Sequence, residues 1–200
     1  FIRVRVEGLE KLDPAAGYVF VSNHQSLMDI PAILSPLPYQ FRFFAKKGLF
    51  GIPFLGTHLK RAGHLPVDRS NARNSLKSMS EGGRIIAQRG VSLLIFPEGG
   101  RAPKGLREFK EGAAYIAIKA GAPVVPMAIN GMRELLPMHS VHIRSGRVRL
   151  RIGEPIPPRK YLEATMFVAI WLQVDGTSMP CCSKTGCPFS SLMTAERLSH

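Results

Sequence analysis

Short apolar runs alternate along this chain with longer segments in which apolar residues recur every three or four positions. The runs predict buried strands, at residues 18–21, 41–45, 65–67, 91–96 and 124–129. The longer segments predict helices, at residues 26–36, 71–89 and 111–120. Residues 3–6 and 147–152 alternate charged and apolar positions, so we expect half-exposed strands there, with 147–152 at an edge. Together these elements predict an α/β fold, a central, mostly parallel sheet flanked by helices.

The pattern loses its period after about residue 160. We expect residues 1–160 to form one domain and residues 161–200, which are rich in Ser, Cys, Pro and Thr, to be a poorly ordered tail. No apolar run approaches the roughly 20 residues of a membrane-spanning helix. The three cysteines have neither zinc-ligand spacing nor an even number. We therefore expect no metal site and a reduced, cytosolic setting.

The charge adds a preference for anions. The chain has 27 Lys and Arg against 14 Asp and Glu, a formal net charge of +13. Such a surface attracts nucleic acid, acidic lipid headgroups or phosphorylated substrates, or it simply keeps the protein soluble. The basic residues are spread along the chain and lack interleaved aromatic residues, which disfavours nucleic acid as the partner.

A histidine and a carboxylate follow the strand predicted at residues 18–21. His24 and Asp29 stand five positions apart in the stretch "NHQSLMD". If His24 lies in a turn before a helix capped by Ser26, Asp29 can meet one nitrogen of its ring and leave the other free to take a proton. The alternative is a histidine that bonds a backbone carbonyl, with Asp29 stabilising the helix N-terminus. No Gly-x-Ser-x-Gly nucleophile motif is present, so a base here would act on a hydroxyl of the substrate.

Basic and glycine residues follow two other predicted strands. Arg69 ends the strand at 65–67, and "PEGGR", residues 97–101, ends the strand at 91–96. In open α/β sheets, ligands bind where the carboxyl ends of strands meet. Forked guanidinium groups suit a phosphate, and Gly99 and Gly100 allow backbone N–H groups to approach it. Glu98 would orient an arginine; in the alternative, Arg69 and Arg101 are surface residues paired with Asp68 and Glu98.

Four sequence blocks in order resemble those of the glycerolipid acyltransferases. The blocks are "NHQSLMD", "GHLPVDR", "FPEGGR" and "VVPMAI", within residues 3–157. The pattern is similar to that of the 1-acyl-sn-glycerol-3-phosphate (lysophosphatidate) acyltransferase family. The resemblance implies the glycerol-3-phosphate acyltransferase-like fold. It also implies transfer of an acyl group from acyl-CoA or acyl carrier protein to the sn-2 hydroxyl of lysophosphatidate, with no cofactor.

The resemblance also implies a role for each residue. His24 is the general base and Asp29 orients it. The pocket for the substrate phosphate is formed or supported by Arg69, Glu98, Gly99, Gly100 and Arg101. Residues that line the acyl or acceptor site are Asn23, Lys46, Val125 and Pro126. Gly100 departs from the family pattern, in which Thr or Ser is usual.

The resemblance implies a setting at the cytoplasmic face of the cell membrane, on an anionic surface. The family's N-terminal membrane-docking helices are not seen before Phe1, so we expect any anchor to lie upstream. The apolar stretch at residues 41–59, which carries Lys46 and Lys47, would sit at a bilayer, line an acyl groove or pack in the core. Two further functions stay open: a same-fold acyltransferase with another acceptor (glycerol-3-phosphate, another lysolipid or an aminolipid), and a non-catalytic module that binds anionic lipid.

Overall fold

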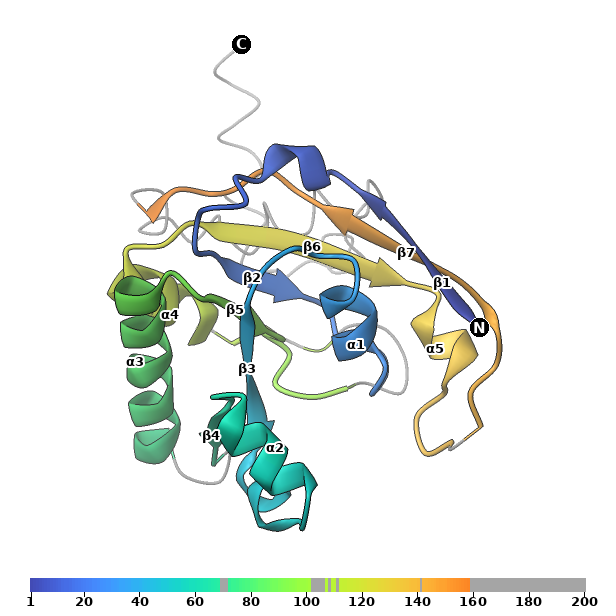
Figure 1. Ribbon diagram of the computed structural model, residues 1–200, viewed down its shortest axis with the longest axis horizontal. Coiled ribbons are helices and arrows are strands. Elements are labelled where there is room, and N and C mark those ends of the chain that lie inside the picture. Colours follow the sequence, from blue (N-terminus) through green and yellow to red (C-terminus); the bar gives the residue numbers. More distant parts are fainter. Residues whose placement is uncertain (69–71, 102–106, 108, 111, 141, 159–200) are drawn as a thin grey trace, which may run out of the picture.

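A computed structural model describes residues 1–68, 72–101, 107, 109–110, 112–140 and 142–158. Its strands form one seven-stranded sheet in the order β1-β7-β6-β2-β5-β3-β4 (Figure 1). The strands are β1 (Ile2–Glu7), β2 (Val19–Ser22), β3 (Phe41–Lys46), β4 (Leu65–Val67), β5 (Ser92–Ile95), β6 (Val124–Asn130) and β7 (Gly146–Ile152). Only the pairing of β6 with β7 is antiparallel among these described strands. The predicted α/β fold with a mostly parallel sheet is confirmed.

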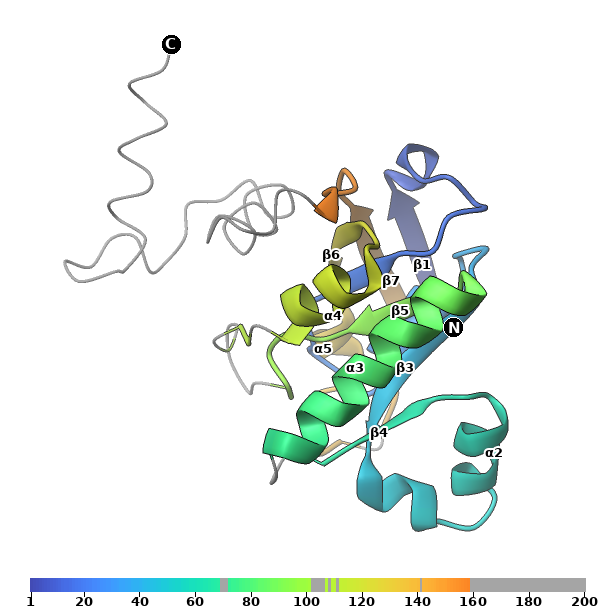
Figure 2. The ribbon, with the colours of Figure 1, turned by 90° about the vertical axis from the view of Figure 1, so that its left-hand side faces the viewer.

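Helices cover both faces of the sheet. The helical elements are η1 (Leu9–Lys11), α1 (Asp29–Leu34), η2 (Lys47–Gly51), α2 (Leu55–Arg61), α3 (Ala72–Arg89), α4 (Gly112–Ala120) and α5 (Met132–Leu135). On one face, α3 and α4 pack against Val19, Val21 and Leu93. On the other face, α1 and α5 pack against Phe20 and Leu94. By contrast, η2 and α2 project beyond the sheet, next to β4 (Figure 2).

The strand that carries the histidine block is the best-buried part of the sheet. All four residues of β2 are buried, and the ring of Phe20 lies 5.0 Å from that of Phe41 and 5.6 Å from that of Tyr18, between centroids. Truncation of a buried Phe to Ala typically costs about 3–5 kcal/mol of stability. The packing of β2 therefore fixes the point at which the turn that carries His24 begins.

Two expectations about the elements are wrong in detail. Strand β7 lies inside the sheet because β1 pairs with it in parallel and takes the edge. The first helix begins at Asp29 rather than at the expected cap, Ser26. The Ser26 hydroxyl donates instead to the Leu136 carbonyl, at 3.1 Å, and accepts from the Met28 N–H, at 3.3 Å.

None of the helices in the part of the chain that the structure describes is long and apolar enough to cross a membrane. The predicted tail, residues 161–200, lies outside the described residues, and so does Asn71, the first residue of the helix predicted at 71–89.

Candidate active site

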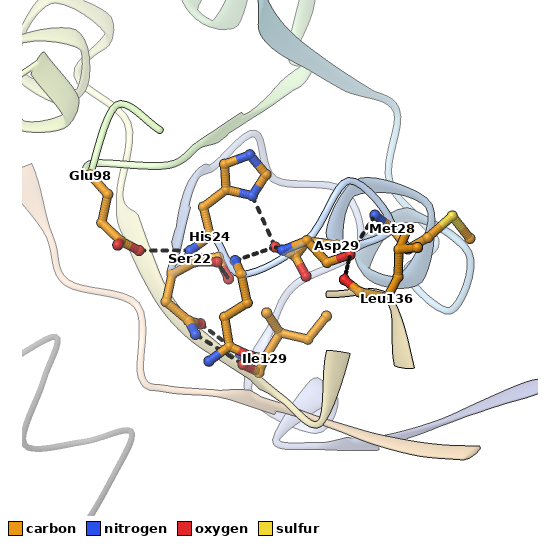
Figure 3. A network of polar contacts seen from close by, with 10 residues as sticks. Ser22, His24, Met28, Asp29, Glu98, Ile129 and Leu136 are labelled. Carbon is orange, nitrogen blue, oxygen red and sulfur yellow. Dashed lines mark hydrogen bonds and ion pairs between the residues drawn. The ribbon is translucent and has the colours of Figure 1, made fainter. Parts of the chain in front are cut away.

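His24 lies in the irregular turn between β2 and α1, and Asp29 is the first residue of α1. The Nδ1 atom of His24 lies 2.9 Å from Oδ2 of Asp29 (Figure 3). The same oxygen accepts the backbone N–H groups of Gln25, at 2.6 Å, and Ser26, at 2.8 Å. One carboxylate oxygen thus holds both the imidazole ring and the turn that carries it. The predicted His24–Asp29 contact is present.

The contact with Asp29 determines which nitrogen of the His24 ring carries the proton. A carboxylate that already accepts two N–H donors offers a lone pair to Nδ1, so Nδ1 carries the proton and Nε2 is the basic nitrogen. Figure 3 shows Nε2 turned away from Asp29, and the side chain keeps 13% of its exposure. The side chain of Asp29 is fully buried, and its second oxygen, Oδ1, has no hydrogen-bond partner among the described residues.

The flat side of the imidazole packs on Phe96, which directly follows β5. The two ring centroids lie 4.1 Å apart at an interplanar angle of 18°. The ring is therefore restrained by a hydrogen bond at its edge and by stacking on its face. The sequence placed Phe96 at the end of a strand and at the start of the block "FPEGGR", but gave it no role in the site. The available signal was an aromatic residue at the end of a neighbouring parallel strand.

Glu98 joins the histidine turn to the loop after β5. Its side chain is almost fully buried, at 2% exposure. Oε1 accepts the backbone N–H of His24, at 2.7 Å, and Oε2 accepts the backbone N–H of Arg107, at 2.9 Å. We expected Glu98 to orient an arginine side chain. The contact with Arg107 instead runs through the backbone, so the carboxylate positions two loops, and its expected contact with an arginine side chain stays a prediction.

Asn23 fastens the other side of the same turn. Its side-chain NH₂ donates to the Ile129 carbonyl, at 2.9 Å, and its Oδ1 accepts the Ile129 N–H, at 2.8 Å. The amide thereby bonds the turn to β6. Asn23 was predicted to line an acyl or acceptor pocket, but both of its polar groups are engaged with backbone.

The remaining basic and glycine residues follow the neighbouring strands. Gly99 has φ 65°, a left-handed conformation that favours glycine, and its N–H donates to the Phe96 carbonyl at 3.0 Å. Gly100 and Arg101 are half-buried, and Lys46 is exposed at the end of β3. Arg69 lies outside the described residues, so its predicted meeting with Arg101 stays a prediction.

The fourth block lies in the core of the sheet. Val125 and Pro126 are both buried in β6, and Val125 has no exposed surface and packs in the core with Phe20. Because β6 is an inner strand of the sheet, both residues pack in the core, and their predicted place beside an acyl or acceptor pocket stays a prediction.

A second histidine, His64, directly precedes β4 and makes none of the contacts described above. Its ring stacks on Phe43, with centroids 3.7 Å apart, and its buried Nδ1 has no partner among the described residues. Burial, followed by repulsion from Arg42 and His58, lowers the pKa of His64 to about 4. It is therefore neutral near pH 7.

The site can perform base chemistry next to a basic loop. Nε2 of His24 is positioned to take a proton, Asp29 offsets the charge that results, and Glu98 ties this base to the loop that carries Arg101. Within the described part of the chain, no group of three or more His, Cys, Asp or Glu side chains is arranged to hold a metal ion.

The chain is similar to known acyltransferases over most of its length. The family described as Acyltransferase matches residues 3–130. The chain is 37% identical over 159 residues to the chloroplastic 1-acyl-sn-glycerol-3-phosphate acyltransferase LPAT1 of Arabidopsis thaliana, which covers 78% of this chain and 44% of that protein. It is 31% identical over 157 residues to 1-acyl-sn-glycerol-3-phosphate acyltransferase alpha of Homo sapiens, covering 78% of this chain and 56% of that protein. The chain thus spans about half the length of these curated relatives.

A solved structure is similar as well. The 1-acyl-sn-glycerophosphate (LPA) acyltransferase PlsC of Thermotoga maritima superposes with a TM-score of 0.73 at 30% identity, over 84% of this chain and 68% of that one.

Proposed function

This chain belongs to the Acyltransferase family, and from that premise we propose that it acylates the sn-2 hydroxyl of lysophosphatidate to form phosphatidate. The observation that carries the proposal is the 2.9 Å contact between Nδ1 of His24 and Oδ2 of Asp29, which leaves Nε2 as a base. The relatives named above act as 1-acyl-sn-glycerol-3-phosphate acyltransferases.

In the proposed reaction the acceptor hydroxyl is the nucleophile. Nε2 of His24 takes the hydroxyl proton while the oxygen attacks the thioester carbonyl of the acyl donor. The tetrahedral intermediate then collapses, the carbon–sulfur bond breaks, and the proton on Nε2 passes to the leaving thiolate. Asp29 keeps the ring oriented and stabilises the imidazolium formed between the two steps. Atoms and charge balance without a cofactor, so we propose that none is required.

We assign the acceptor phosphate to the loop after β5. Arg101 supplies a guanidinium group and Gly99 a compact backbone turn. We propose Arg69 as a second phosphate ligand on the strength of its sequence block, which begins before β4 and ends two residues after it in the sequence. The donor is acyl-CoA or acyl carrier protein.

We further propose that the reaction takes place on an anionic membrane surface, at the cytoplasmic face of the cell membrane. The acceptor is a lipid and the donor is water-soluble, so the two meet at such a surface. The net charge of +13 favours an anionic one.

The test is release of free thiol from acyl-CoA in the presence of lysophosphatidate. His24→Ala should lower kcat by ~10²–10⁴, the usual worth of general-base catalysis, and leave the far-UV circular dichroism unchanged. His142→Ala is the matched control, because His142 is an exposed histidine in the segment before β7. Parent-like turnover by His24→Ala would refute the mechanism.

Arg101→Ala tests the phosphate site. Loss of a charge-assisted hydrogen bond should raise KM for lysophosphatidate about 10–100-fold, while Arg3→Ala, an exposed position on β1, should leave KM unchanged. An unaltered KM for Arg101→Ala would remove that residue from the phosphate site.

A further inference from the structure

Residues 46–61, which we name the η2–α2 lobe, are mostly exposed to solvent. Only Gly56 and Leu59 of this lobe are buried. The lobe carries Lys46, Lys47, Lys60 and Arg61 and contains no Asp or Glu. It is thus a positively charged projection with almost no core of its own.

The lobe exposes four large apolar side chains within seven consecutive residues, 49–55. Phe54 is 90% exposed, Ile52 45%, Leu55 41% and Leu49 37%. The other exposed large apolar residues of the described chain are scattered over the position before β1, the turn before α1, α3, α4 and the segment before β7. Single exposed apolar residues are ordinary, but a group of them marks a surface that another partner covers.

Phe54 combines an exposed side chain with an unfavourable backbone conformation. Phe54 has φ 61°, which is unfavourable for a bulky L-residue. Nearby, Gly56 packs so tightly that a Cβ there would collide with the carbonyl oxygen of Phe50. The turn between η2 and α2 is therefore closely packed on its inner side, while its most apolar side chain points to solvent.

The charges around the apolar group indicate which partner fits. A pocket of about 590 Å³ lies between the lobe and α3. Its lining residues include Lys47, Lys60, Lys77 and Phe50. Lysines beside exposed aliphatic and aromatic side chains match a bilayer interface, where ammonium groups meet lipid phosphates and apolar side chains enter the acyl region. A nucleic acid would leave Ile52, Leu55 and Leu49 without a partner.

We propose that the η2–α2 lobe docks on the surface of an anionic lipid bilayer. Phe54, Ile52 and Leu55 enter the interface, and Lys47 and Lys60 contact lipid phosphates. The inference deepens the proposed function, on which it rests for the need to meet a lipid substrate.

The docked lobe would bring the candidate active site to the membrane. The lobe begins at the end of β3, and β3 lies two strands from β2 in the sheet. Neighbouring strands are ~4.8 Å apart, so the ends of β2 and β3 are separated by about 10 Å.

Flotation with lipid vesicles tests the proposal. The 200-residue chain should float with phosphatidylcholine vesicles that contain phosphatidylglycerol and bind vesicles of phosphatidylcholine alone far more weakly. Phe54→Asn should lower the partition coefficient about tenfold, and Asn is chosen because it tolerates the left-handed backbone. Lys60→Ala should lower binding about fivefold to anionic vesicles only. Ile118→Asn, at an exposed apolar residue of α4, is the matched control and should bind as the parent does.

Three outcomes would overturn the proposal. The parent could fail to float with anionic vesicles, or Phe54→Asn could float as well as the parent. The third is a parent that is dimeric in size-exclusion chromatography and becomes monomeric through Phe54→Asn, which would assign the apolar group to a second copy of the chain.

An activity measurement separates this inference from the proposed function. With short-chain lysophosphatidate below its aggregation concentration, Phe54→Asn should release thiol at the parent rate, and with vesicle-borne lysophosphatidate it should be slower. If the parent releases no thiol with any acceptor but the flotation results hold, the lobe docks as proposed and the proposed reaction is wrong.

Discussion

Asp29→Asn separates the charge of the carboxylate from its geometry. Oδ2 of Asp29 accepts three hydrogen bonds, from Nδ1 of His24 and from the backbone N–H groups of Gln25 and Ser26. An amide can place its carbonyl oxygen at this position and its NH₂ at the position of Oδ1. The two backbone donors enforce that orientation, because an NH₂ facing them would bring donors together. The substitution should therefore keep the tautomer of His24 while removing the negative charge.

The expected loss of rate follows from the distance. Unit charges about 4 Å apart interact by about 4 kcal/mol at an effective dielectric constant of ~20, and each ~1.4 kcal/mol changes a rate tenfold. The Nδ1–Oδ2 distance of 2.9 Å and the 13% exposure of the ring place the imidazolium near that limit, and the remaining amide dipole recovers part of it. We expect kcat to fall by ~10²–10³, with KM for lysophosphatidate unchanged.

The expected loss of stability is smaller. The introduced NH₂ would be buried where Oδ1 has no partner among the described residues, which costs about 1–3 kcal/mol of unfolding free energy. Asp29→Ala would instead leave three donors without their acceptor, for roughly 3–6 kcal/mol, a large part of a typical domain's stability. Asp29→Asn is therefore the informative variant.

The assay is thiol release at saturating acyl-CoA, together with urea unfolding of each variant. Asp13→Asn serves as the control, since Asp13 is exposed and its Oδ1 accepts the N–H of Ala15. A folded Asp29→Asn protein with the kcat of the parent would show that the carboxylate only shapes the turn and that His24 does not become charged during the reaction.

Three further changes test one support of the site, Glu98, and two packed positions elsewhere in the fold, His64 and Gly8. Glu98→Gln leaves one of its two backbone donors, such as that of Arg107, facing an NH₂ group; we expect urea unfolding to show a loss of about 1–3 kcal/mol, with kcat lowered more than KM. For His64, the folded pKa of about 4 lies below the ordinary histidine value of 6.5, so the unfolded chain binds more protons between these values and stability falls as pH drops through that window. Because the ring is partly solvated, we expect the loss to be ~1–2 kcal/mol and His64→Phe to remove it in urea titrations across the window. Gly8→Ala should lower the melting temperature by several degrees, ~4–8 °C per kcal/mol in a small domain, because Gly8 has φ 91° and a Cβ would collide with the Ile152 carbonyl.

The elements with one clear pattern were predictable, and their lateral positions were not. The buried run at β5 and the helix that ends before Gly90 match the expectation closely. The alternation in β7 reports that one of its faces is exposed, as its burial pattern confirms. It does not report how many neighbours the strand has. An inner strand whose outer face is bare therefore looks like an edge strand in sequence.

In the site, too, some residue roles were predictable from the sequence and others were not. His24 and Asp29 were predictable because both partners are side chains with a recognisable spacing. The roles of Glu98 and Asn23 were not, since their partners are the backbone groups of His24, Arg107 and Ile129. Every residue has such groups, so the sequence carries no mark of which ones are bonded.

These backbone contacts explain why the base can be precise although it lies in an irregular turn. Asn23 bonds the turn to β6, Glu98 bonds it to the loop after β5, and Asp29 bonds it to the start of α1. The turn is thus fixed from three sides, and Phe96 restrains the face of the ring. Nε2 of His24 makes no hydrogen bond within the described residues, so it can meet a substrate hydroxyl without first breaking a contact. Positioning of this kind lowers a barrier because the ordering is complete before the substrate arrives. It follows that loosening any one support should reduce kcat more than it weakens substrate binding, whereas loss of Arg101 should do the reverse.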